Sequence, residues 1–296
     1  MSESCTDSGR PTLSTLHNQW DMRPALLLGE EAQSRALDLT PITLAVTHLP
    51  PGMDGLRIAH VTDTHFRAPG PLLDKTVDLL TNGRPDLIAV TGDLINYPAG
   101  PEVGAAFLRR VVPLAPTFVV LGNHEHKRSL RLTPVAEVYA DAGAIVLMND
   151  AVRWEHEGSA IWIAGVDDPF EIRHDLERAF APVPPGAPTI LLAHSPAPAR
   201  AFAAAGASVI LCGHTHGGQV RLPFIGPIRL HNRMERRFCS GVFGAEEIGA
   251  GPWDPDPSMV VSRGVGALRL PIRIFCPPEI PLITLRSVSS MYHRES

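Results

Sequence analysis

Short apolar runs, each closed by a glycine or a polar residue, recur along the chain. They span residues 56–61, 87–90, 118–121, 190–193 and 209–212. Runs this short and nearly continuous are typical of strands that are buried on both faces. Between them, apolar positions repeat at helical spacing over residues 71–80 and 102–112. This alternation predicts an α/β protein, in which functional sites form beyond the carboxyl ends of the strands.

Other segments predict further strands with less regular spacing. Residues 43–46 alternate and then turn at 50–52 back to residue 56, which indicates a leading hairpin. A second sheet is expected from residues 151–155, 160–164, 259–262 and 282–285. Proline- and glycine-rich stretches at 182–188 and 249–257 are predicted to be loops within one domain, since strands follow both.

The segments that close the five apolar runs carry carboxylate, imidazole and amide side chains. They supply Asp63 and His65, then Asp93, then Asn123 and His124, then His194, and finally His214 and His216. Such a mixture of ligands, with one carboxylate free to bridge, suits a two-metal hydrolytic site. A single Asp-x-His or Gly-Asp is more often an ordinary turn at a strand end. Five such segments in one order and one strand context favour a metal centre instead.

The order D-x-H, G-D, G-N-H-E, H, G-H-x-H resembles the calcineurin-like metallophosphoesterase superfamily, from about Thr43 to Arg286. Residues 213–227, 261–266 and 278–280 are similar to its bacterial branch of YkuE- and YaeI-like phosphoesterases, some of which act on membrane-derived lipids. The resemblance implies an α/β fold of two packed mixed β-sheets flanked by helices, a four-layer sandwich.

The resemblance also implies a role for each matched side chain. It assigns Asp63, His65 and His216 to a first metal ion, Asn123, His194 and His214 to a second, and Asp93 to a bridge between them. His124 would not bind metal; it would lie over the substrate, stabilise the phosphoryl oxygens and protonate the leaving group. Two cations about 3.5–4 Å apart clamp a phosphoryl group and lower the pKa of a bridging water. The ligand mixture favours Mn²⁺ or Fe, with Zn²⁺ or Mg²⁺ as alternatives.

The expected activity is hydrolysis of a phosphodiester or pyrophosphate bond, in a lipid or nucleotide conjugate, by a metal-bound hydroxide. The alternative is a phosphomonoesterase, including a phosphoprotein phosphatase, because the same metals serve both reactions and only the pocket differs. A non-catalytic scaffold is a third reading, and the complete ligand set together with His124 disfavours it.

Candidate substrate contacts surround these motifs. His126 follows His124 by two residues, and a cluster of arginines lies beyond the last histidine motif: Arg229, Arg233, Arg236 and Arg237. Arginine forks suit phosphate groups, although a solvated loop containing Glu235 explains the cluster equally well. Asp167 and Asp168 are expected to form a turn at another strand end.

An apolar stretch follows His216 over residues 220–230 and contains Phe224 and Ile225. Burial as a strand and turn is the ordinary explanation. An exposed apolar loop rimmed by arginines would instead suit a lipid substrate and reversible contact with a membrane.

Composition sets the remaining limits. The 296 residues are 44% hydrophobic, enough for one large core, and the net charge of −5 gives no support for specific nucleic-acid binding. The four cysteines have no metal or disulfide spacing, which fits a reducing, cytoplasmic location, and Cys212 and His60 are expected in the core.

Residues 25–28 are too short for a signal peptide or membrane span. Residues 1–38 are expected to form a polar extension with a short helix at 30–37, and residues 39–296 the catalytic domain. The oligomeric state is not indicated.

Overall fold

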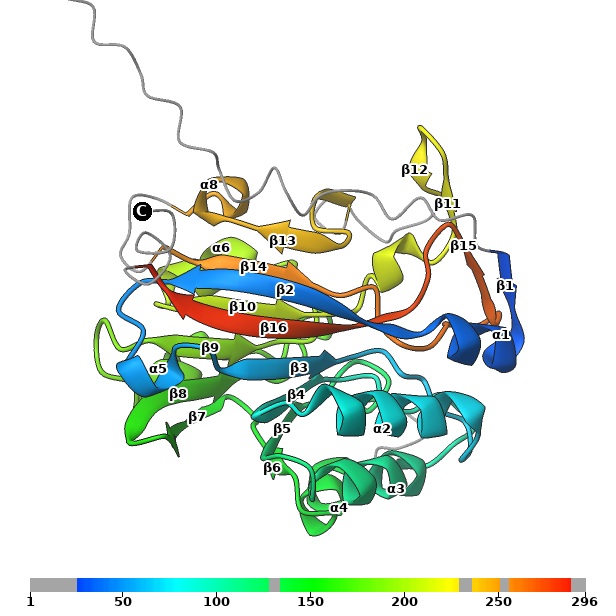
Figure 1. Ribbon diagram of the computed structural model, residues 1–296, viewed down its shortest axis with the longest axis horizontal. Coiled ribbons are helices and arrows are strands. Elements are labelled where there is room, and N and C mark those ends of the chain that lie inside the picture. Colours follow the sequence, from blue (N-terminus) through cyan, green and yellow to red (C-terminus); the bar gives the residue numbers. More distant parts are fainter. Residues whose placement is uncertain (1–25, 128–133, 229–235, 251–255, 289–296) are drawn as a thin grey trace, which may run out of the picture.

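Two mixed β-sheets pack face to face in the computed structural model, which describes residues 26–127, 134–228, 236–250 and 256–288 (Figure 1). The first sheet has the order β2 (Asp38–Val46), β16 (Glu279–Ser287), β3 (Arg57–Val61), β4 (Leu87–Thr91), β5 (Thr117–Val120) and β6 (Ile145–Val146). The second has the order β13 (Gly241–Phe243), β14 (Ser258–Val261), β10 (Val209–Cys212), β9 (Thr189–Leu192), β8 (Ser159–Gly165) and β7 (Asp150–His156). The expected fold of two mixed sheets is confirmed.

Alternation along the strands divides the apolar residues among three cores. In β4, Leu87 belongs to the core between the sheets, whereas Ile88 faces the outer core of the first sheet. In β9, Ile190 faces the core between the sheets and Leu191 faces the outer core of the second sheet. Because both faces of each strand are covered, the sequence shows continuous apolar runs instead of alternation with polar residues.

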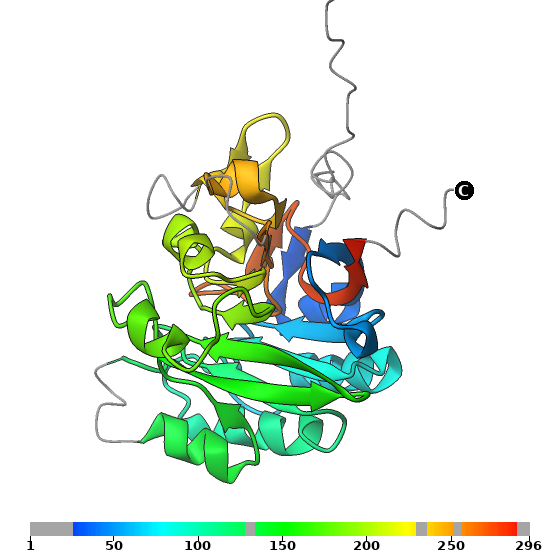
Figure 2. The same ribbon diagram turned by 90° about the vertical axis from the view of Figure 1, so that its left-hand side faces the viewer.

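Helices cover the two outer faces. α2 (Pro71–Gly83), α3 (Pro101–Val111) and α4 (Val135–Asp141) pack on the first sheet, and α5 (Leu176–Phe180), α6 (Ala199–Ala204) and α8 (Ala245–Ile248) pack on the second. In the turned view of Figure 2 the cyan and blue-green helices lie at the bottom, away from the yellow-green and orange helices. The helices predicted over residues 71–80 and 102–112 are confirmed as α2 and α3.

The C-terminal strand β16 corrects two of the sequence predictions. It lies between β2 and β3, so that Ile283 pairs with both Ile42 and Ile58, and β2 and β3 do not form a hairpin. It also places residues 282–285 in the first sheet, not in the second. The period of a strand shows which faces are buried, but it does not identify the neighbouring strand.

A small addition precedes and flanks the sandwich. β1 (Leu26–Leu28) pairs with β15 (Ile272–Ile274), and α1 (Gly29–Ala36) confirms the short helix expected at 30–37. Residues 26–36 of the expected extension therefore contact the domain. The division at residue 38 stays a prediction. Residues 1–25 lie outside the described part. β11 (Arg221–Leu222) and β12 (Gly226–Pro227) form a short hairpin. Within the described ranges, no helix has the length and apolar character needed to span a bilayer.

Candidate metal centre

Loops at the carboxyl ends of strands from both sheets bring the expected ligands together. Those after β3, β4 and β5 of the first sheet carry Asp63, His65, Asp93 and Asn123, and those after β9 and β10 of the second carry His194, His214 and His216. All of these side chains are buried except Asn123, which is half-buried. The parallel pairs β3–β4, β4–β5 and β9–β10 place their loops at common edges.

The backbone at five of these seven residues is left-handed, a conformation that L-residues rarely adopt. Positive φ angles occur at Asp63 (51°), His65 (46°), Asp93 (53°), His214 (69°) and His216 (52°). Each such residue costs on the order of 1–3 kcal/mol and persists only where the surroundings enforce it. At Gly213, a Cβ atom would collide with the side chains of Thr62 and Asp63. The strain is thus concentrated where these side chains converge.

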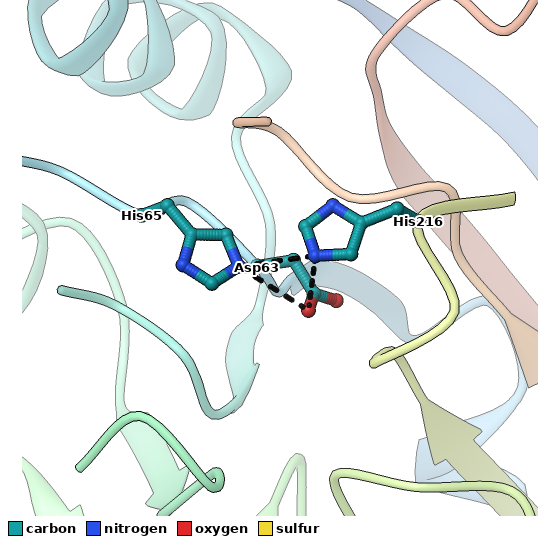
Figure 3. Close-up of side chains that lie close together, drawn as sticks. All are labelled: Asp63, His65 and His216. Atoms are coloured by element: carbon teal, nitrogen blue, oxygen red, sulfur yellow. Dashed lines mark hydrogen bonds and ion pairs between the residues drawn. The ribbon is translucent and has the colours of Figure 1, made fainter. Parts of the chain in front are cut away.

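The two oxygens of Asp63 have different surroundings. Oδ2 accepts hydrogen bonds from the backbone N–H of His214 (2.8 Å) and from Oγ1 of Thr62 (2.9 Å). Oδ1 is buried and has no hydrogen-bond donor among the described residues. It lies 3.4 Å from Nε2 of His216 and 3.9 Å from Nε2 of His65, and Figure 3 shows both rings next to this carboxylate. These two nitrogens are 3.0 Å apart. A cation fits this arrangement, because it would give the carboxylate oxygen and both nitrogens one partner.

The two carboxylate oxygens of Asp93 also have different surroundings, and the residue lies between two groups of proposed ligands. Its Oδ1 accepts from the backbone N–H of His124 (2.7 Å). Its Oδ2 lies 3.6 Å from Nε2 of His65 and 3.4 Å from Nε2 of His194. The oxygen that is free of backbone contacts therefore faces one histidine of each group, the position a bridging carboxylate would occupy.

The second group contains an amide and two imidazoles. Oδ1 of Asn123 lies 3.1 Å from Nε2 of His194 and 3.1 Å from Nδ1 of His214, and these two nitrogens are also 3.1 Å apart. Nδ1 of His194 donates to the carbonyl oxygen of Thr91 (2.8 Å). Since that carbonyl can only accept, it orients the ring so that Nε2 faces the other ligands.

The electrostatics of the cluster also suit cations. Burial, with a contribution from Asp93, raises the pKa of Asp63 to about 6, against the attraction of His194. Burial lowers the pKa of His65 and of His216 well below the usual value. For Asp93, burial opposes ionisation, but the neighbouring His194, His124 and His65 outweigh it and hold its pKa well below the ordinary range. Carboxylates buried this deeply require positive partners, which divalent ions would supply.

Glu125 connects two of the loops, a role that the sequence did not assign although it lies inside the G-N-H-E motif. Its carboxylate accepts from the backbone N–H groups of Asp93 (2.8 Å), Leu94 (2.9 Å) and Gly122 (3.0 Å). Burial, with the nearby charge of Asp93, raises its pKa to about 7. Glu125 thus holds the loop after β4 against the loop after β5.

Arg273 supports the loop of His216 and was not found from the sequence, since no motif contains it. Its guanidinium is fully buried and donates to the carbonyls of Arg263 (2.8 Å), Gly266 (3.0 Å) and His216 (3.4 Å). The thiol of Cys276 also donates to the carbonyl of His216 (3.2 Å).

His124 lies beside the first group of ligands. Its ring is edge-on to that of His65, with centroids 4.5 Å apart, and His65, Asp93 and His124 form a further cluster able to hold an ion. Nζ of Lys127 lies 2.8 Å from Nδ1 and 2.7 Å from Nε2 of His124. Burial, with the positive charge of Lys127 and against the attraction of Asp93, lowers the pKa of His124. Lys127 is a second contact that sequence reasoning did not identify.

The residues expected to contact the substrate differ in their surroundings. Nε2 of His126 lies 2.5 Å from Oδ1 of Asp167, so the turn at Asp167 reaches the loop of the metal centre. Arg236 and Arg237 are exposed, and Arg237 donates to the carbonyl of Glu247. Arg229 and Arg233 lie outside the described residues. The expected core positions of His60 and Cys212 are confirmed, since both are fully buried.

Known proteins resemble this chain over most of its length. The family model described as "Calcineurin-like phosphoesterase" matches residues 56–218. The "Uncharacterized metallophosphoesterase YkuE" of Bacillus subtilis (strain 168) is 31% identical, over 86% of this chain and 87% of that protein. "Phosphodiesterase YaeI" of Escherichia coli (strain K12) is 29% identical, over 77% of this chain and 82% of that protein. The "Transmembrane protein with metallophosphoesterase domain" of Bos taurus is 29% identical, over 84% of this chain and 57% of that protein.

Proposed function

Since this chain belongs to the calcineurin-like phosphoesterase family and is a phosphoric ester hydrolase, we propose that it hydrolyses a phosphodiester or pyrophosphate bond with two divalent metal ions. One observation carries the proposal. Asp63 and Asp93 each have one oxygen held by a backbone N–H and the other directed at histidine nitrogens. Two ligand groups that share a central carboxylate provide for two cations, not one.

The proposed ligands are Asp63, His65 and His216 on one side, Asn123, His194 and His214 on the other, and Asp93 between them. When bound, the metals would supply Lewis acidity toward the phosphoryl oxygens and a nucleophile near neutral pH. The oxygen and imidazole donors favour Mn²⁺ or Fe, with Zn²⁺ or Mg²⁺ as alternatives.

His124 and Lys127 would act on the substrate itself. His124 has its backbone N–H on Asp93, which fixes the residue beside the cluster. We assign its ring to holding a phosphoryl oxygen and donating a proton to the leaving oxygen. The ammonium of Lys127, next to that ring, would add a positive charge where the phosphate is negative. His126, beside Asp167, and the exposed Arg236 and Arg237 remain candidates for contacts farther along the substrate.

The preferred substrate class is a lipid or nucleotide conjugate. The relative YaeI is named a phosphodiesterase, which supports a diester for this chain. Cytoplasmic location with reversible membrane contact completes the proposal. The thiols of Cys212 and Cys276, which form no disulfide among the described residues, support a reducing compartment, and the exposed side chains of Phe224 and Ile225 support contact with lipid.

Hydrolysis of bis-p-nitrophenyl phosphate compared with p-nitrophenyl phosphate, with added Mn²⁺, tests the proposal. We expect the diester to be the better substrate, a chelator to abolish turnover, and elemental analysis to find about two metals per chain. A preference for the monoester would favour the phosphomonoesterase alternative. Full activity of metal-free protein would overturn the metal-centre assignment, and metal binding without turnover of either ester would favour a scaffold.

A further inference from the structure

Four short strands extend the fold next to the metal centre. β1 pairs antiparallel with β15, Val220 forms a bridge with Ile274 of β15, and β11 continues from Val220 and pairs with β12. In Figure 1 these strands lie together at the right-hand end of the molecule, with β11 and β12 projecting upward. The segment begins directly after His216–Gly218, so it is continuous with the loop that carries a proposed metal ligand.

The strand register places apolar side chains on one side of this assembly. Leu26 pairs with Ile274 and Leu28 with Ile272, and Val220 lies beside Ile274. Paired residues in a β-ladder face the same side of the sheet, and side chains alternate along each strand. These five side chains therefore share one side.

The hairpin continues the same side outward. The backbone N–H of Ile228 donates to the carbonyl of Val220 (3.1 Å), which continues the register of β11 and β12 and puts Leu222 and Ile228 beside Val220. The side chains that stand most clear of the protein form what we call the apolar face: Leu26, Leu28, Leu222, Phe224, Ile225 and Ile228. At the hairpin tip, Phe224 is 102% exposed and Ile225 is 74% exposed.

The other side of these strands faces the protein and carries two arginines together with the apolar Leu27, which pairs with Arg273. Arg273, which alternates with Ile272 and Ile274, is fully buried and reaches the carbonyl of His216. Arg221 donates to Oγ of Ser240. Exposed apolar side chains on the outer side and arginines on the inner side are the reverse of the usual orientation. A contiguous apolar surface of this kind marks an interaction site.

Positive charge borders the apolar face on the side of the metal centre. The amide of Gln219 donates to the carbonyls of Leu268 and Leu270, which ties the loop before β15 to the hairpin. Arg269 in this loop is exposed, and its carbonyl accepts from Arg67, an exposed residue that follows His65 by two positions. The apolar face thus ends at two arginines beside the metal centre.

We propose that the apolar face binds the surface of an anionic lipid bilayer, with Phe224 and Ile225 among the acyl chains and Arg67 and Arg269 at the phosphate headgroups. A projecting tip without charge, bordered by cations, matches the apolar interior and anionic surface of a bilayer. The contact would bring lipid phosphates to the loop of His216. The lipid substrate in this inference rests on the proposed function. Vesicle binding is measured without turnover, so the membrane contact and the proposed hydrolysis can fail separately.

Co-sedimentation of the full-length protein with phosphatidylcholine vesicles, with and without phosphatidylglycerol, tests this inference. We expect the wild type to bind, and to bind better when phosphatidylglycerol is present. The variant Phe224→Ser/Ile225→Ser should lose about tenfold or more of the binding to both vesicle types, because two apolar side chains no longer leave water. The variant Arg67→Gln/Arg269→Gln should lose only the preference for phosphatidylglycerol.

Leu114→Ser/Ile172→Ser is the matched control, since it also replaces two exposed apolar side chains, elsewhere on the surface; it should bind as the wild type does. Thermal unfolding and turnover of bis-p-nitrophenyl phosphate should be unchanged in the tip variant, which shows that it is folded. Equal vesicle binding by the wild type and the tip variant would overturn the inference. So would light scattering that shows a wild-type dimer and a monomeric tip variant, because the face would then join two copies of the chain.

Discussion

At the candidate metal centre, Asp63 and Asp93 are almost completely buried, whereas on the apolar face Phe224 is fully exposed and Ile225 is largely exposed. Both placements cost stability, the first by removing charge from water and the second by leaving apolar surface in it. Arg273 connects the regions, since it lies on the inner side of β15 and contacts the loop of His216. The costs would be offset by cations in one region and by lipid in the other.

The two regions differ in how firmly the protein itself holds them. The proposed ligands lie on loops that hydrogen bonds to Glu125 and Thr91 hold in place, and their left-handed backbone requires such support. The hairpin tip projects from β11, which is joined to the protein by the bridge from Val220 to Ile274 and by the hydrogen bond from Arg221 to Ser240. Substitutions should therefore affect chemistry strongly at the centre, and binding to a surface at the tip.

The largest effect is expected for Asp93→Asn. Loss of the shared charge leaves two cations without the carboxylate that offsets their repulsion. Metal content and activity should fall together, with turnover lower by on the order of 10³-fold or more. Elemental analysis and hydrolysis of bis-p-nitrophenyl phosphate measure both. Asp167→Asn, a buried carboxylate outside the ligand groups, should keep both metals; an Asp93→Asn protein with two metals and wild-type turnover would contradict the bridging role.

His124→Asn should separate metal binding from chemistry. Both metals should remain, while kcat falls on the order of 10²–10⁴-fold, the usual scale for general acid catalysis and transition-state stabilisation. Metal analysis beside steady-state kinetics gives the answer. A variant that loses a metal but retains wild-type turnover per remaining holoenzyme would show that His124 is a ligand, as its cluster with His65 and Asp93 also allows.

Lys127→Met should have a smaller effect of the same kind. Removing the ammonium beside His124 should lower kcat/KM by about 10- to 100-fold with both metals retained, since one charge-assisted contact to phosphate is lost. Lys75→Met, the other lysine of the chain, is the control and should match the wild type. Unchanged kcat/KM in Lys127→Met would show that the ammonium does not contact the substrate.

The smallest effect concerns stability outside both regions. Burial lowers the pKa of His60 from 6.5 to about 3. Between pH 6.5 and pH 3, the His60 ring is therefore protonated in the unfolded chain but neutral in the folded chain. The contribution of His60 to the free energy of unfolding is present above pH 6.5 and is lost as the pH falls toward 3. When the pH falls from 7 to 5, the free energy of unfolding should decrease less in His60→Asn than in the wild type. The two slopes should differ by on the order of 1 kcal/mol per pH unit. Urea unfolding at equal metal concentration measures the difference, and parallel pH dependences would contradict the buried neutral state.

Much of the centre could be predicted because its signals are local. Each proposed ligand lies within a few residues of the end of an apolar run, and a run followed by Gly-Asp or Asn-His indicates both a strand and the side chain near its end. The helices α2 and α3 were predicted for the same reason, since their apolar spacing lies within one segment. The carboxyl ends of neighbouring parallel strands lie at a common edge, so the approximate meeting of the ligands within each sheet needed no further information. The meeting of the two edges depends on how the sheets pack.

The sequence by itself therefore determined the strands, the helices and the residues at the strand ends, because these depend on neighbours within a few positions. Only the tertiary structure decided which strand lies beside which, as with β16 between β2 and β3. It also decided which side of residues 220–228 faces water, since exposure depends on what distant segments cover. Arg273 belongs to the same class, because its contacts join loops that are separate in the chain and no local pattern records such contacts.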